Sequence, residues 1–276
     1  MNKQPSVKEF RHNAEMPLSI LGYALTAVVT IGAVIALISG IILKEWTTPI
    51  LIGLASPFIG LFFVRYMYYK KISNGIKLTD KQLPELYKIY KELALKMGFK
   101  DGTENPIPEI YLINGNGVMN AFASKCSLYS KYIVLHSDIV DIAYGQNNFE
   151  ALKFIMAHEL GHILCKHIEL KRLIVAPIMT LLFLNKSLTR AQEYTADRVA
   201  LYYASEGSMS MIYLFAGKNL GKHVDIEEYF NTIEKHEEDI WLKFINFRSD
   251  HAVGYRRMKA VKLAKEKGWN VHGRML

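Results

Sequence analysis

The chain has 276 residues, half of them hydrophobic, and a formal net charge of +8. Its two cysteines, Cys126 and Cys165, lack C-x-x-C spacing, which excludes a disulfide framework and a cysteine metal site and fits a reducing compartment. A basic chain is also a candidate for nucleic-acid binding, but no recognisable module or pattern of basic and aromatic residues supports it. We therefore expect no nucleic-acid partner.

Two long uncharged stretches lie near the N-terminus. Residues 16–43 and 46–64 carry no charged side chain, and each is long enough to cross a bilayer. We expect transmembrane helices at about 17–43 and 46–64, joined into a hairpin by the short turn Lys44–Glu45. Two buried core helices are the alternative, but uncharged runs of this length are uncommon in soluble cores. Residues 1–70 would then form a tail with two spans, and residues 71–276 a separate domain.

Basic residues on both sides of this hairpin predict its orientation. Lys8 and Arg11 precede the first span, and Arg65 and Lys70 follow the second. The positive-inside rule places both flanks in the cytoplasm. We expect a multi-pass protein of the cell membrane, with the later domain on the cytoplasmic side and the lipid bilayer, including its anionic lipids, as a partner.

The later chain mixes helical and extended patterns. An amphipathic helix is predicted at 82–96, and a small antiparallel sheet from strands at 110–113, 119–123 and 132–135. A second helical pattern runs from Phe149 toward Lys171. The fold class is therefore α+β and mainly helical.

Two further segments carry specific expectations. Residues 173–184 are too few to span a bilayer and contain Pro177, so we expect a buried or membrane-surface segment. Residues 226–247 are helical in character, with Trp241, Phe244 and Phe247 predicted to lie in the core.

The motif His158-Glu159-Leu160-Gly161-His162 lies within the predicted helix that starts at Phe149. Positions four apart share one helix face, so both imidazoles can reach one metal ion. Glu159 is suited to take a proton from a metal-bound water, as in zinc metalloproteases with the H-E-x-x-H motif. Two buried histidines on an apolar face are costly unless a metal compensates for their desolvation.

A catalytic zinc site needs a third protein ligand. Glu193 and Asp197 are also four apart, so both carboxylates can lie on one face of a second helix. Glu193 could bind the metal while Asp197 accepts a ring N–H from a ligand histidine. The spacing leaves open a second interpretation, a solvated helix on which these acids pair with Arg190 and Arg198.

The chain resembles the HtpX-like membrane zinc metallopeptidases, whose relatives include the type I CAAX prenyl endopeptidases. Four elements match in order over roughly residues 75–265: Asn120-Ala121-Phe122-Ala123, His158 to His162, Glu193 with Asp197, and His251 with Arg257. Ala252 and Val253 depart from the Pro-Pro that the family has after the late histidine.

The resemblance implies a zincin-like domain that binds one Zn²⁺ per chain through His158, His162 and Glu193. It implies that Asp197 supports a ligand histidine, and that Glu159 is the catalytic acid and base. Asn120, Ala121 and Phe122 would contact an extended substrate. His251 would stabilise the oxyanion, with Arg257 orienting it or binding a nearby carboxylate.

The expected function is therefore zinc-dependent endopeptidase activity on protein or peptide substrates at the membrane, in membrane-protein quality control. A dedicated processing protease and a non-catalytic, zinc-stabilised scaffold that binds a partner are the alternatives. The intact Glu159 argues against a scaffold, because a structural zinc site does not need this acid. The sequence carries no signal for the natural substrate or the oligomeric state.

Overall fold

The computed structural model describes residues 5–43, 48–126, 130–249 and 254–275. Its N-terminal part consists of α1 (Val7–Phe10), α2 (Glu15–Leu43) and α3 (Thr48–Ile72). The strands are β1 (Ile76–Lys77), β2 (Glu109–Ile113), β3 (Ala121–Lys125) and β4 (Lys131–His136). The other helices are α4 (Pro84–Lys96), α5 (Ser137–Gln146), α6 (Glu150–Leu164), α7 (Leu170–Leu181), α8 (Asn185–Tyr203), η1 (Ser205–Gly207), α9 (Ile212–Leu220), η2 (Gly221–His223), α10 (Ile226–Glu234), α11 (Ile240–Arg248) and α12 (Gly254–Lys267).

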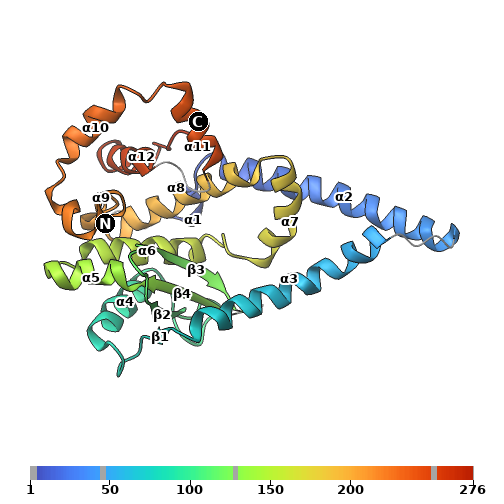
Figure 1. The fold of residues 1–276 in the computed structure, drawn as a ribbon, viewed down its shortest axis with the longest axis horizontal. Helices are drawn as coiled ribbons and strands as arrows, with labels where there is room; N and C mark the ends of the chain where they lie inside the picture. The colour runs from blue at the N-terminus through green and yellow to red at the C-terminus, as the bar shows by residue number, and fades with distance from the viewer. Residues whose placement is uncertain (1–4, 44–47, 127–129, 250–253, 276) are drawn as a thin grey trace.

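Helices α2 and α3 extend from the same side of a compact body (Figure 1). Within the described residues, α2 is the helix whose length and composition suit a membrane span, over Glu15–Gly40. Only 6% of its apolar window is buried, so the protein's own core does not cover this surface. The predicted turn Lys44–Glu45 lies outside the described residues. The pairing of two spanning helices therefore stays a prediction.

Helix α7 occupies most of the segment predicted to be buried or at the membrane surface. Val175 and Met179 are buried, and they form a small apolar cluster with Leu18 of α2 and Leu188 of α8. The opposite face is open, since Ile174 and Leu181 are exposed. The helix is thus amphipathic and lies against the base of α2.

The sheet is mixed, which corrects the predicted antiparallel arrangement. Its order is β1-β2-β4-β3, with β2 and β4 parallel and the outer pairs antiparallel. After β2 the chain passes to the far edge, forms β3, and returns as β4 between the two. The strand pattern alone identifies strands and not their neighbours, which is why consecutive strands were expected to pair. Strand β1 was not predicted.

Helices α6 and α8 pack against each other at the centre of the body, and α6 lies beside the sheet (Figure 1). A Cβ on Gly161 of α6 would lie 3.1 Å from the Cβ of Val199 on α8, so this glycine allows the two helices to approach closely. Helix α6 ends at Leu164, before the predicted Lys171, and Lys166 adopts a left-handed conformation with φ of 63°. This turn redirects the chain toward α7.

The predicted helix at 226–247 is two helices, α10 and α11. Asp239 caps α11, because its side chain accepts a hydrogen bond from the Trp241 N–H. The prediction that Trp241, Phe244 and Phe247 lie in the core was wrong, since all three are exposed. Apolar identity indicates a preference for burial, but the position of α11 at the surface leaves these rings outside.

Candidate metal centre

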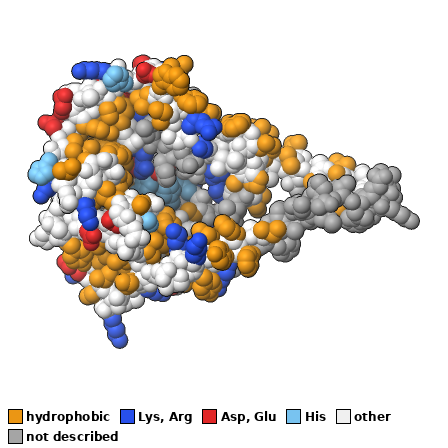
Figure 2. Space-filling model, viewed as in Figure 1, with side chains coloured by type: hydrophobic (Ala, Val, Ile, Leu, Met, Phe, Trp, Pro, Cys, Tyr) orange, Lys and Arg blue, Asp and Glu red, His pale blue; other side chains and the backbone are white. Residues whose placement is uncertain are grey.

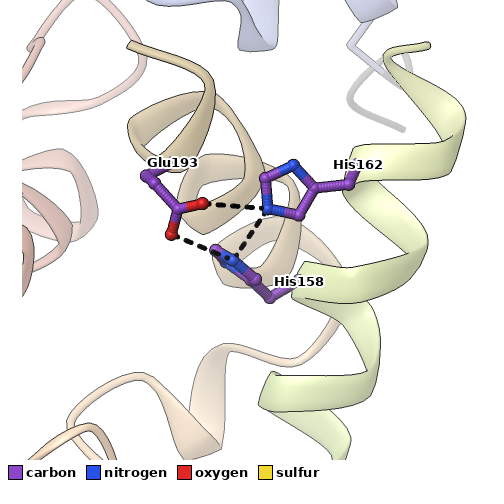
Figure 3. Close-up of side chains that lie close together, drawn as sticks. All are labelled: His158, His162 and Glu193. Atoms are coloured by element: carbon purple, nitrogen blue, oxygen red, sulfur yellow. Dashed lines mark hydrogen bonds and ion pairs between the residues drawn. The ribbon is translucent and has the colours of Figure 1, made fainter. Parts of the chain in front are cut away.

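Three side chains from α6 and α8 converge on one point (Figure 3). The Nε2 atoms of His158 and His162 are 3.1 Å apart. Glu193 Oε1 lies 3.3 Å from His162 Nε2, and Glu193 Oε2 lies 3.5 Å from His158 Nε2. The helical spacing places both histidines on one face of α6, and the close approach of α8 brings the carboxylate to them.

These three donors fit a zinc ion. Ligands bonded to zinc at about 2.0–2.1 Å in a tetrahedron lie roughly 3.3 Å apart, which matches the three separations. All three donor atoms lie within 4.8 Å of one another. Two imidazoles and one carboxylate also form a donor set typical of catalytic zinc.

Asp197 and Arg257 surround the donors with a buried ionic network. His158 Nδ1 lies 2.9 Å from Asp197 Oδ1. Arg257 Nε and Nη2 donate to the two oxygens of Asp197 at 2.8 and 2.6 Å. Arg257 Nη1 lies 2.9 Å from Glu193 Oε2. The arginine on α12 therefore holds both carboxylates of α8.

This network shifts the pKa of its members. Burial alone would raise the pKa of Asp197, but the charge and hydrogen bonds of Arg257 outweigh it and lower that pKa. Burial acts to lower the pKa of His158, while its contacts with Asp197 and Glu193 raise it to about 10. The pKa of Arg257 is raised despite its burial, because Asp197 and Glu193 stabilise its charge. In the absence of metal, the network thus favours the charged forms of Asp197, His158 and Arg257.

A cleft of about 280 Å³ opens beside the three donors, and Glu159 lines it together with them. Figure 2 shows this hollow, with histidine side chains at its base. Glu159 is buried, so it is shielded from bulk water at the end of the cleft where the donors lie. Its place next to the donors suits proton transfer to and from a reacting water.

The predicted substrate residues line the same cleft. Asn120, Ala121 and Phe122 form part of its wall. Asn120 precedes β3, and its carbonyl accepts a hydrogen bond from the His136 N–H. Strand β3 is the last strand in the sheet order, so its outer edge has no strand partner within the described residues. Sheet edge and metal donors thus face one cavity.

His251 lies outside the described residues, so its role stays a prediction. Arg257, expected to orient His251 or to bind a nearby carboxylate, forms ion pairs with both Asp197 and Glu193. The sequence reasoning also missed His167, which lines the cleft and lies against His162. Its only sequence signal is a third histidine five residues after the motif.

An H-E-x-x-H helix, a glutamate on a second helix and an adjoining sheet edge define the chain as a protein of the metallopeptidase class. The model for "Peptidase family M48" matches residues 80–185. This region contains His158 to His162 but ends before Glu193. The chain is thus similar to the HtpX-like proteins of peptidase family M48, in agreement with the resemblance noted in the sequence.

Two curated relatives agree with this family. Over 155 residues the chain is 26% identical to a protease HtpX homolog of Dictyoglomus turgidum, covering 53% of this chain and 47% of that protein. Over 109 residues it is 24% identical to the plastoglobule-localized metallopeptidase 48, chloroplastic, of Arabidopsis thaliana, covering 40% and 28%. The match thus spans less than half of each relative. No solved structure matches the chain significantly. The family supports a metalloprotease, which implies a metal, typically zinc.

Proposed function

We propose that this protein is a membrane-anchored zinc endopeptidase that hydrolyses peptide bonds of protein substrates. The observation that carries the proposal is the convergence of His158, His162 and Glu193 at zinc-ligand distances, with Glu159 beside them in an open cleft. One Zn²⁺ per chain would occupy this position. The match of residues 80–185 to the model for peptidase family M48 supports the same chemistry.

The chain's own residues supply positioning and proton transfer. When bound, zinc polarises the scissile carbonyl and makes water more acidic. Glu159 takes the proton of the attacking water and passes it to the leaving amine. Asp197 accepts the Nδ1–H of His158, so that the Nε2 lone pair of this ring faces the metal position. Arg257 forms ion pairs with Glu193 and Asp197 and so fixes the positions of both carboxylates.

The edge of β3 supports a general mode of substrate binding. An extended peptide can add to an unpaired strand edge through main-chain hydrogen bonds, which demand little of its sequence. Asn120, Ala121 and Phe122 would then guide the peptide along the cleft toward the metal position. We retain His251 as the proposed donor to the oxyanion. This binding mode suits the quality control of many membrane proteins better than a processing protease with one substrate.

The N-terminal helices support anchoring in a bilayer. The apolar surface of α2 is left exposed by the rest of the protein, which would be costly in water. Arg65 and Lys70 lie on α3, and Lys8 and Arg11 precede α2. We propose that α2 and α3 are the two spans and that the metal centre lies on the cytoplasmic side.

The test is cleavage of casein by the purified full chain. We expect cleavage to stop when a chelator is added, and to be lost in Glu159→Gln while zinc content is unchanged. Glu150→Gln is the matched control on the same helix, because among the described residues the Glu150 carboxylate pairs with the neighbouring Lys153 near the surface and should tolerate the change. Full turnover by Glu159→Gln would contradict the mechanism. Zinc binding without any proteolysis would favour the scaffold alternative.

A further inference from the structure

The ring of His162 has a second nitrogen that points away from Glu193 (Figure 3). This nitrogen, Nδ1, lies 2.9 Å from Nδ1 of His167. The other ring nitrogen of His167, Nε2, lies 3.2 Å from Glu15 Oε1. A continuous hydrogen-bonded row therefore runs from the metal position through two histidines to a carboxylate at the start of α2.

Local backbone structure returns His167 to His162. Helix α6 ends one residue before Cys165, and the left-handed Lys166 reverses the chain. The His167 N–H then donates to the carbonyl oxygen of His162 at 2.9 Å. This turn orders His167 next to the helix end and leaves its ring buried against that of His162.

Glu15 is held in place by several partners although it is 1% exposed. Arg11 forms an ion pair with its Oε1, and the hydroxyl of Thr195 donates to its Oε2 at 2.5 Å. Thr195 lies on α8 between Glu193 and Asp197. Arg11 also donates to the carbonyl oxygen of Cys165 at 2.7 Å. The first turn of α2 is thus attached to both helices of the metal centre.

The chemistry of the row selects one set of tautomers. Nε2 of His162 can bind a metal only if the ring proton is on Nδ1. That N–H donates to Nδ1 of His167, which leaves the proton of His167 on Nε2, where it donates to the Glu15 carboxylate. The reverse arrangement would put a proton on the ligand nitrogen of His162. It would also set a ring lone pair of His167 against the carboxylate oxygen, an unfavourable contact between two acceptors.

We propose that His167 and Glu15 are positioning residues that hold His162 in its metal-binding tautomer. The inference rests on the proposed zinc function and adds to it, because residues at the base of the apolar helix α2 then contribute directly to metal affinity. Asp197 serves His158 in the same way from α8. Each histidine ligand is thus oriented by a separate carboxylate, one directly and one through a second histidine.

The test is the affinity of the full chain for Zn²⁺ alone, measured in detergent by competition with a chromogenic chelator. We expect His167→Leu and Glu15→Leu each to weaken zinc binding by about 10- to 100-fold, as for other outer-shell partners of metal ligands. His167→Gln should recover most of this loss, because one amide can accept from His162 and donate to Glu15. The exposed His223 provides the control, and His223→Leu should leave the affinity unchanged.

A second measurement avoids variants that fail to fold. In ¹⁵N-histidine-labelled wild-type protein loaded with zinc, nitrogen shifts report which ring nitrogen carries the proton. We expect His162 to be protonated at Nδ1 and His167 at Nε2. Protonation of His167 at Nδ1, or a zinc affinity within twofold of wild type in folded His167→Leu, would overturn this inference and leave the proposed function intact. Absence of zinc binding by the wild type would overturn both, whereas loss of proteolysis alone would affect only the proposed function.

Discussion

Asp197→Asn is the change that most directly tests the buried network of the metal centre. Asp197 is 1% exposed and accepts two hydrogen bonds from Arg257, at 2.8 and 2.6 Å. Asparagine keeps the volume but removes the charge, so Arg257 loses one of its two carboxylate partners and keeps the ion pair with Glu193. Breaking a buried ion pair by removing one partner typically costs about 3–5 kcal/mol of folding free energy. For a chain of this size, that lowers the melting temperature by roughly 6–20 °C.

The assay is thermal unfolding of the metal-free protein in detergent at neutral pH. Asp141→Asn is the matched control, because Asp141 is 59% exposed and pairs only weakly with Lys218 at 3.4 Å. A surface pair of this kind contributes about 1 kcal/mol at most. A melting temperature for Asp197→Asn equal to that of the control would refute the conclusion that the Asp197–Arg257 pair stabilises the body.

The same variant has a pH signature. Because the pKa of Asp197 is lowered by folding, its contribution to stability is present above the ordinary carboxyl pKa and is lost as the pH falls through the lowered value. The difference in unfolding free energy between wild type and Asp197→Asn should therefore be constant near neutral pH and shrink below a pH of about 4. A difference that grows with acidification would contradict this assignment of charge.

Further predictions concern the ligands and the helix contact. Replacing a residue that hydrogen-bonds to a metal ligand typically weakens metal binding by about 10- to 100-fold. Glu193→Ala should weaken zinc binding by more than this, because it removes a ligand itself. Unchanged metal content after dialysis would exclude Glu193 as a ligand. Gly161→Ala should lower the free energy of unfolding by about 1–3 kcal/mol, because the added methyl group would press on Val199. Its control is Gly145→Ala, where the added methyl group meets open space and the free energy of unfolding should be unchanged or higher. Chelation followed by dialysis should abolish casein cleavage, and added zinc should restore it; cleavage that survives metal removal would contradict metal dependence.

Interactions between near neighbours in the chain were predictable from the sequence. A helix repeats every 3.6 residues, so the spacing of His158 and His162, and of Glu193 and Asp197, is enough to place each pair on one helix face. The same periodicity predicted the amphipathic helix α4. Uncharged length predicted the apolar helix α2, because a span needs only about 20 consecutive apolar residues.

Contacts between distant segments were decided by the tertiary structure. Nothing in the spacing of the strands indicates that β4 lies between β2 and β3, and the surface position of α11 overrides the apolar character of Trp241. Arg257 reaches Asp197 across 60 residues, and Glu15 reaches His167 across 152. The sequence by itself therefore determined the metal-binding motif on each helix. Only the packing of α2, α6, α8 and α12 brought the donors and their supporting charges together, because such contacts depend on close approach in space and leave no periodic pattern in the chain.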